Sequence, residues 1–189
     1  MGNKSSSSVA VPKDDLIAIT NSTKFTLGEI EYLYTRFCAL GAPQRRTGFL
    51  VKRDFNFPSY ALHSLILTEM FGNKYDITFV EFAKFLHTFR PLDFKASKEE
   101  RAAMKTRKLK LLFSMYDINK DGSISKEDLL DVVHRLCSDY TDIHTMIKIV
   151  QLVIKEMDST KTNRILFDDF CKSMEIFDMD NLAVKFPTL

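Results

Sequence analysis

Residues 117–128 read D-I-N-K-D-G-S-I-S-K-E-D, and this stretch decides how the chain folds. Asp117, Asn119 and Asp121 stand at positions one, three and five, so their side-chain oxygens alternate toward a central cation. Gly122 stands at position six, where the backbone turns sharply and a side chain would obstruct the turn. The other expected ligands are the carbonyl of Ser123 at position seven and the side chains of Ser125 and Asp128 at positions nine and twelve. Oxygen donors at this spacing predict a loop that binds a hard divalent cation.

The sequence on both sides of this loop has the period of amphipathic helices. Apolar residues recur at i, i+3, i+4 and i+7 before the loop, and again after it. They are Leu109, Leu112, Phe113 and Tyr116, then Leu129, Val132, Val133 and Leu136. A helix, this loop and a second helix form the pattern of an EF-hand. A plain surface turn between two helices is the alternative, and it leaves the spacing of the ligands unexplained.

Position twelve departs from the common pattern, which has Glu there to hold calcium with both carboxylate oxygens. Asp128 is one methylene shorter, so we expect it to reach the ion with one oxygen. Coordination then falls from about seven oxygens toward about six, which suits magnesium. We therefore expect one site that holds Ca²⁺ or Mg²⁺, with weaker calcium affinity than a Glu loop. An inward shift of the backbone that restores calcium affinity is the alternative.

Helix, loop and helix recur four times along the chain, and EF-hands occur in pairs. We therefore predict an all-α fold of two lobes, each a pair of EF-hands with short antiparallel strands between its loops. The expected segments are a flexible N-terminal segment (1–23), an N-terminal pair (24–92), a charged connector (93–108), a C-terminal pair (109–178) and a tail (179–189).

The fourth loop is a weaker candidate for a second metal site. Its expected ligands at positions one, three, five, seven and twelve are Asp158, Thr160, Thr162, Arg164 and Asp169. Two neutral threonines leave few charges to offset dehydration of an ion. Asn163 replaces glycine at position six, and Asn tolerates the left-handed backbone better than most residues. Ile165 stands in phase with Ile124, so the alternative role is to pair with the third loop and stabilise it.

The first two loops lack the side chains that hold a cation. With Ile77 at position eight, the second loop has Met70, Gly72 and Lys74 at ligand positions. The first loop is too long for the usual frame and carries Arg45 and Arg46 where carboxylates belong. We expect the N-terminal lobe to bind no metal and to act as a constant binding surface.

The composition favours a regulatory protein of the cell interior. The chain has sixteen Phe, eight Met and no Trp, with a net charge of +2, and Phe and Met suit a core that also accepts a partner helix. Three dispersed cysteines indicate free thiols in a reducing compartment. The four histidines show no metal-ligand clustering and no nucleophile motif is present, so we expect no enzyme. Glu99 and Glu100 interrupt the basic stretch at 95–110, so we expect no nucleic-acid partner.

The N-terminal sequence predicts a lipid. Met1-Gly2-Asn3-Lys4-Ser5-Ser6 fits the pattern for N-myristoylation, with the acyl chain on Gly2 after removal of Met1. One myristoyl chain anchors a protein only marginally. Stable attachment therefore requires a partner, or the acyl chain lies in a protein pocket. We expect a cytoplasmic protein that is peripheral at the membrane.

An apolar groove is expected where the helices of paired EF-hands open, and an amphipathic helix fits such a groove. Its candidate lining residues come from both lobes: Phe82, Phe85, Leu86, Phe89, Leu112, Phe113, Val133 and Met174. The partner would be the helix of a membrane transporter, channel or receptor tail. Each residue alone has core packing as its alternative role.

The chain resembles the calcineurin B-like group of EF-hand regulators over nearly its whole length. The stretches Leu33-Tyr34-Thr35-Arg36-Phe37 and His87-Thr88-Phe89-Arg90-Pro91 are most similar to the calcineurin B homologous proteins. That resemblance implies a non-catalytic protein that binds an amphipathic helix in the cytosolic tail of a sodium/proton exchanger. The Met-Gly start, the long first loop and Asp128 resemble the calcium- and integrin-binding proteins, which implies docking onto an integrin tail or mechanosensory channel. A calcineurin B-like phosphatase regulatory subunit is a further alternative.

Overall fold

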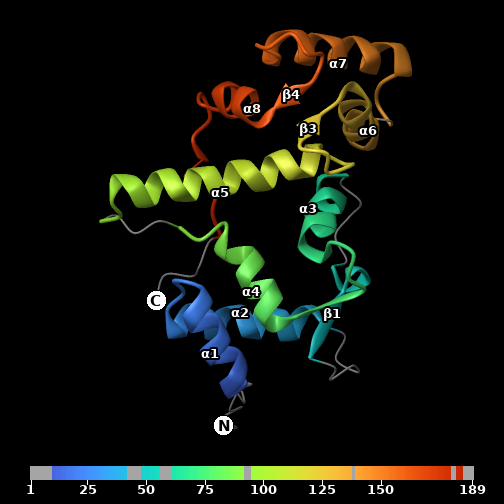
Figure 1. The fold of residues 1–189 in the computed structure, drawn as a ribbon. Helices are drawn as coiled ribbons and strands as arrows, with labels where there is room; N and C mark the ends of the chain where they lie inside the picture. Colours follow the sequence, from blue (N-terminus) through green and yellow to red (C-terminus); the bar gives the residue numbers. More distant parts are fainter. Residues whose placement is uncertain are drawn as a thin grey trace, which may run out of the picture. The chain divides into compact units, whose positions relative to one another are not determined.

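The computed structural model describes residues 10–41, 48–55, 61–91, 95–137, 139–179 and 182–184. In these residues the protein is mainly helical, with eight α-helices and two short pairs of antiparallel strands (Figure 1). This confirms the predicted all-α fold of paired EF-hands. The chain divides into two compact units: an N-terminal unit within 1–56, 70–91 and 183–189, and a C-terminal unit within 57–69 and 92–182.

The elements follow one another as helix, strand and helix around each loop. The helices are α1 (Lys13–Ser22), α2 (Leu27–Leu40), α3 (Ala61–Phe71), α4 (Phe79–His87), α5 (Lys98–Tyr116), α6 (Lys126–Cys137), α7 (Ile143–Met157) and α8 (Phe167–Ser173). The strands are β1 (Phe49–Val51), β2 (Asp76–Thr78), β3 (Ser123–Ile124) and β4 (Ile165–Leu166), and a 3₁₀ turn, η1, covers Lys52–Asp54. No helix among these is long and apolar enough to span a bilayer.

In the N-terminal unit, β1 and β2 join the first and second loops. They run antiparallel with Leu50 opposite Ile77, and both side chains are almost fully buried. Helix α4 begins directly after β2 with a capping box, in which Thr78 accepts from the Glu81 N–H at 3.2 Å and Glu81 accepts from the Thr78 N–H at 2.8 Å. The strand pair and the cap fix where α4 starts.

Aromatic side chains fill the core of the N-terminal unit. The ring of Phe37 lies 5.4 Å from that of Phe79 and 5.6 Å from that of Phe82, and Phe55 meets Phe71 edge to face at 5.8 Å. Such edge-to-face and tilted pairs stabilise beyond the area they bury. The abundance of Phe in the sequence therefore serves the core first.

Helix α1 corrects the expected flexibility of residues 1–23 for residues 13–22, whereas residues 1–9 lie outside the described part of the chain. Residues 13–22 are helical, Ile19 is fully buried, and α1 packs against α4 within the N-terminal unit. A ten-residue helix is marginal alone in water, so packing decides whether it forms. One buried isoleucine is too weak a sequence signal for such a helix.

Helix α5 includes most of the predicted connector, residues 93–108. It starts at Ser97, whose hydroxyl accepts from the Glu100 N–H at 3.1 Å while Glu100 accepts from the Ser97 N–H at 3.1 Å. The charged side chains form its solvent face, whereas Met104 and Lys108 are buried. From Lys98 onward the segment is thus the entering helix of the third EF-hand rather than a separate linker.

The C-terminal unit has β3 and β4 at its centre, with Ile124 opposite Ile165. Both side chains are 1% exposed, which confirms that the two loops pair in the predicted phase. Around them lies one apolar cluster of buried residues: Leu109, Phe113, Leu129, Val150, Ile154, Phe170 and Met179. The start of the tail belongs to this cluster through the Met179 side chain. The Met179 carbonyl also accepts a hydrogen bond from the buried Lys108 ammonium at 2.7 Å.

Candidate functional site

The third loop begins at Asp117, the C-cap of α5, which is 4% exposed. Its carboxylate accepts from the N–H of Asp121 at 3.1 Å and from the N–H of Gly122 at 2.9 Å. Gly122 has a φ of 87°, a conformation that side chains rarely adopt. The loop therefore turns where the sequence predicts, around the carboxylate at position one.

The next two expected ligands also bond to the loop backbone. The Asn119 amide oxygen accepts from the Asp121 N–H at 2.9 Å. The Oδ1 atom of Asp121 accepts from both the N–H and the hydroxyl of Ser123, at 3.0 and 2.8 Å. The Ser123 hydroxyl bond is the main reason that the pKa of Asp121 lies below its ordinary value. Asp121 is therefore held as a carboxylate, the form that binds cations.

Asp128 takes part in a cap at the start of α6. The N–H and hydroxyl of Ser125 donate to Oδ2 of Asp128 at 2.9 and 2.5 Å, and the Ser125 oxygen accepts from the Asp128 N–H at 3.1 Å. Both residues are buried. With Oδ2 engaged in this way, a cation in the loop would meet Asp128 through Oδ1.

The chemistry of the donor set fits a hard cation, because the ligands are carboxylate, amide, hydroxyl and carbonyl oxygens on one turn. Their present arrangement is not an assembled cage. Within the described parts of the chain, no three His, Cys, Asp or Glu side chains gather closely enough to hold a metal. The carboxylates of Asp121 and Asp128 bond to neighbouring donors instead. Metal ligation by this loop stays a prediction.

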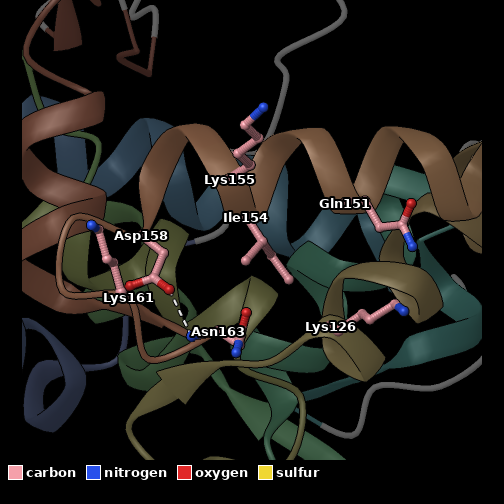
Figure 2. A pocket seen from close by; sticks show the side chains of 7 residues that line it. All are labelled: Lys126, Gln151, Ile154, Lys155, Asp158, Lys161 and Asn163. Carbon is pink, nitrogen blue, oxygen red and sulfur yellow. Dashed lines mark hydrogen bonds between the residues drawn. The ribbon is translucent and has the colours of Figure 1, made fainter.

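The fourth loop has the same backbone frame with fewer charged ligands. Asp158 accepts from the Thr162 N–H at 3.1 Å. It also accepts from the Asn163 N–H at 2.6 Å (Figure 2). Asn163 has a φ of 59°, so it adopts the left-handed conformation that glycine has at this position of the third loop. Thr160 also donates to Asp158 at 3.1 Å, and Thr162 donates to the Arg164 carbonyl at 3.2 Å.

Asp169, at position twelve of this loop, is 3% exposed. The Ser159 hydroxyl donates to its Oδ1 atom, whereas Oδ2 is buried and has no hydrogen-bond partner among the described residues. A buried carboxylate oxygen without a partner is costly and is usually satisfied by a water or an ion. The fourth loop therefore keeps one feature of a metal site.

A cavity of about 720 Å³ lies beside the fourth loop, and the positive charges that line it disfavour a cation there. Figure 2 shows Ile154 directed toward the loop, with Lys155 directed away from it on the same helix. Three lysines line this surface, Lys126, Lys155 and Lys161, against the single carboxylate of Asp158. Their ammonium groups point in different directions, so they do not form one anion site.

Arg164 makes a contact that the sequence does not predict. Its guanidinium reaches from the fourth loop to the third, where Nε donates to the Ser123 hydroxyl at 2.6 Å and Nη2 pairs with Asp121. The only sequence signal is the phase of Ile124 and Ile165, which places Arg164 beside the third loop. The direction of its side chain does not follow from that phase.

In the second loop a lysine ammonium occupies one of the ligand positions. The Lys74 ammonium, at position five, pairs with Glu81 at position twelve. This hydrogen bond is the main reason that the pKa of Glu81 lies below its ordinary value of 4.5. The Lys74 ammonium thus pairs with the carboxylate at the position that a metal would use in an EF-hand loop. Arg45 and Arg46 of the first loop, and Gly2, lie outside the described residues.

The candidate groove residues divide into core and surface. Phe82 and Phe113 are only 5% and 7% exposed, so the structure corrects their assignment to a groove. Phe82 packs against Phe37, and Phe113 against Phe170 at 5.5 Å. The other six are half-buried, three in the N-terminal unit and three against the C-terminal core: Phe85, Leu86, Phe89, Leu112, Val133 and Met174.

Comparisons with known proteins match both the C-terminal unit and the whole chain. A family model described as an EF-hand domain pair matches residues 106–175. The type 1 calcineurin B subunit of Dictyostelium discoideum is 31% identical over 90% of this chain and 89% of its own length. Calcineurin B homologous protein 3 is 28% identical in Xenopus laevis, over 86% of each chain, and 26% identical in Homo sapiens, over 92% of each.

Proposed function

The chain belongs to the calcineurin B family of EF-hand proteins, and from this premise we propose that it clasps an amphipathic helix in the cytosolic part of a membrane protein. It is a calcium-binding EF-hand protein with a regulatory role. Members of this kind are non-catalytic, which confirms the prediction that the chain is not an enzyme. The proposal adds the kind of partner and the way it is held.

The observation that carries the proposal is the number of large apolar side chains exposed on the C-terminal unit. Nine large apolar side chains are exposed among its described residues: Leu136, Tyr140, Ile143, Ile149, Leu152, Leu166, Ile176, Phe177 and Leu182. Isolated exposed apolar residues are ordinary, but several here occupy one helix, α7. Together with the half-buried Leu112, Val133 and Met174, they supply the area that an amphipathic helix covers.

The ion and the lipid complete the proposal. We assign the calcium site to the third loop, with magnesium as an alternative occupant because Asp128 is short. We place a myristoyl group on Gly2 on the strength of the N-terminal pattern. A single acyl chain adds to the partner contact without replacing it. The protein would then act in the cytoplasm at the membrane surface.

A phosphatase regulatory subunit is the second candidate. It is favoured by the 31% identity to the type 1 calcineurin B subunit, which exceeds the identity to the homologous protein 3 sequences. A role like that of the calcium- and integrin-binding proteins, on an integrin or mechanosensory channel, has only the sequence resemblance in its favour.

Calorimetric titration with two partners separates these candidates. The full chain is titrated with the helical tail segment of a sodium/proton exchanger and, separately, with the calcineurin catalytic subunit. We expect submicromolar binding to the exchanger tail with a negative heat-capacity change, because apolar area is buried. Tight binding to the catalytic subunit alone would reject the membrane-protein proposal in favour of the phosphatase.

A matched pair of variants tests the surface itself. Met174→Ala shortens a half-buried side chain in the candidate groove, and Ile17→Ala shortens an exposed one on α1. Met174→Ala should weaken partner binding at least about fivefold, as truncation of a contact residue commonly does. Ile17→Ala should leave it unchanged. Equal effects of the two variants would show that the groove is misplaced.

A further inference from the structure

The contact between the two loops of the C-terminal unit bears directly on metal binding. Arg164 approaches the third loop at the point where β3 and β4 pair. Its guanidinium bridges two residues of that loop, through Nε to the Ser123 hydroxyl at 2.6 Å and through Nη2 to Oδ2 of Asp121. One cationic side chain thus connects the fourth loop with an expected metal ligand of the third.

Both oxygens of Asp121 are engaged in this arrangement. Oδ1 accepts from the N–H and hydroxyl of Ser123, and Oδ2 accepts from the Asn119 amide at 3.1 Å as well as from the guanidinium. Asn119 is itself an expected ligand, so a second ligand is drawn into the same network. A divalent cation therefore meets ligands that are already satisfied, one of them by a full positive charge.

We propose that Arg164 is a built-in competitor of the divalent cation, so that the fourth loop sets the calcium affinity of the third. The ion gains Asp121 as a ligand only when this carboxylate turns away from the guanidinium, or when it shares its negative charge between the guanidinium and the ion. This inference rests on the calcium site proposed for the third loop. It gives the degenerate fourth loop a role other than binding a second ion.

In the second loop, too, a side-chain cation pairs with a carboxylate at a ligand position. There Lys74 pairs with Glu81 inside one loop whose first, third and fifth positions carry no carboxylate. In the third loop the competing cation comes from the neighbouring loop, and the carboxylates that a metal needs are retained. In the third loop the Arg164 guanidinium and a divalent ion from solution therefore compete for the same carboxylate, that of Asp121.

The size of the effect follows from charge and exposure. The side chains of Arg164 and Asp121 are 41% and 38% exposed, so water screens their attraction strongly. A positive charge this close to a doubly charged ion at a partly screened site lowers the affinity for the ion by about tenfold. The competition therefore tunes affinity and does not abolish binding.

Calorimetric titration of calcium into three full-length chains tests the proposal. They are the wild type, Arg164→Gln, which removes the charge, and Lys161→Gln, which removes one charge from the same loop away from Asp121. We expect Arg164→Gln to bind calcium about tenfold more tightly, and Lys161→Gln to differ from wild type by less than about twofold. Calcium should also raise the melting temperature of Arg164→Gln more than that of the wild type.

Unchanged or weaker calcium binding by Arg164→Gln would overturn the inference, as would an equal gain in Lys161→Gln. Absence of binding in all three chains would instead remove the third-loop site, so the two failures are distinct. Arg164→Lys keeps the charge but loses the forked contact, and we expect it to lie between wild type and Arg164→Gln. If Arg164→Gln does not fold, Arg164→Met, which also removes the charge, takes its place, and wild-type calcium affinity in that folded chain contradicts the proposal.

Discussion

We expect the length of one side chain, Asp128, to control which ion the third loop prefers. Its Oδ2 atom is held by the N–H and hydroxyl of Ser125, which also fix the start of α6. That arrangement leaves one carboxylate oxygen for the loop centre, where a Glu would offer two. A six-oxygen shell suits the smaller ion, so we propose that this side chain links the capping of α6 to the choice of ion.

Asp128→Glu should therefore shift the preference of the loop toward calcium. The added methylene lets both oxygens reach the ion, and we expect calcium affinity to rise on the order of tenfold with little gain for magnesium. Competitive calorimetry with both ions measures the change. A parallel gain for the two ions would show that reach is not what limits the wild type.

Lys74 and Glu81 give the N-terminal unit a pH dependence. The Lys74 hydrogen bond lowers the pKa of Glu81, so its stabilisation is fully present above the ordinary value of 4.5 and is lost as the pH falls through the lower folded value. The Lys74 side chain is 62% exposed, so the pair contributes less than about 1 kcal/mol.

The variant Lys74→Gln should lower the free energy of unfolding by that small amount at pH 7, since it removes the partner of Glu81. The difference from wild type should shrink as the pH falls below 4.5, because Glu81 then protonates in both chains. Urea unfolding at several pH values measures this, with Lys84→Gln on α4 as the charge control. A difference that grows on acidification would contradict the sign.

At the scale of elements, the long helix α5 changes the organisation expected from sequence. The charged stretch before the third loop is helical from Lys98, and its first turn is closed by the reciprocal bonds of Ser97 and Glu100. One continuous helix therefore runs into the third loop at Asp117. Helix α3 is part of the same packing, since Leu65 lies in a buried cluster with Met115 and Val132.

Ser97→Ala should destabilise the C-terminal unit by about 1 kcal/mol, the usual cost of losing an N-cap side chain. Thr106→Ala, in the middle of α5, is the matched control and should be neutral or slightly stabilising. Chemical unfolding followed by circular dichroism measures both. If residues 93–108 were a flexible linker, neither substitution would change stability.

At the scale of the whole molecule, the sequence was most informative where spacing alone determines structure. The four loops, the pairing of Ile124 with Ile165 and the turn at Gly122 all follow from position along the chain. Helix α1 and the Arg164 bridge depend on packing and on side-chain direction, which no periodicity encodes. For the same reason, spacing did not distinguish core from surface at Phe82 and Phe113.

We expect a divalent ion to bind the C-terminal unit and not the N-terminal unit. In the second loop Lys74 pairs with Glu81, and the N-terminal core is built from aromatic side chains such as Phe37, Phe79 and Phe82. The third loop keeps its carboxylates, and we expect it to bind calcium or magnesium. We therefore expect the protein to stay bound to its partner and to change its affinity for the partner with the ion, rather than to switch between bound and free.

Binding of the exchanger-tail helix with and without calcium tests this central claim most directly. The full chain is titrated with the helix by calorimetry, first with calcium and then with EGTA and magnesium. We predict that binding in EGTA and magnesium stays within about tenfold of binding in calcium, because magnesium fills the third loop and the N-terminal unit needs no ion. Complete loss of binding in EGTA with magnesium present would contradict the account and identify a calcium sensor.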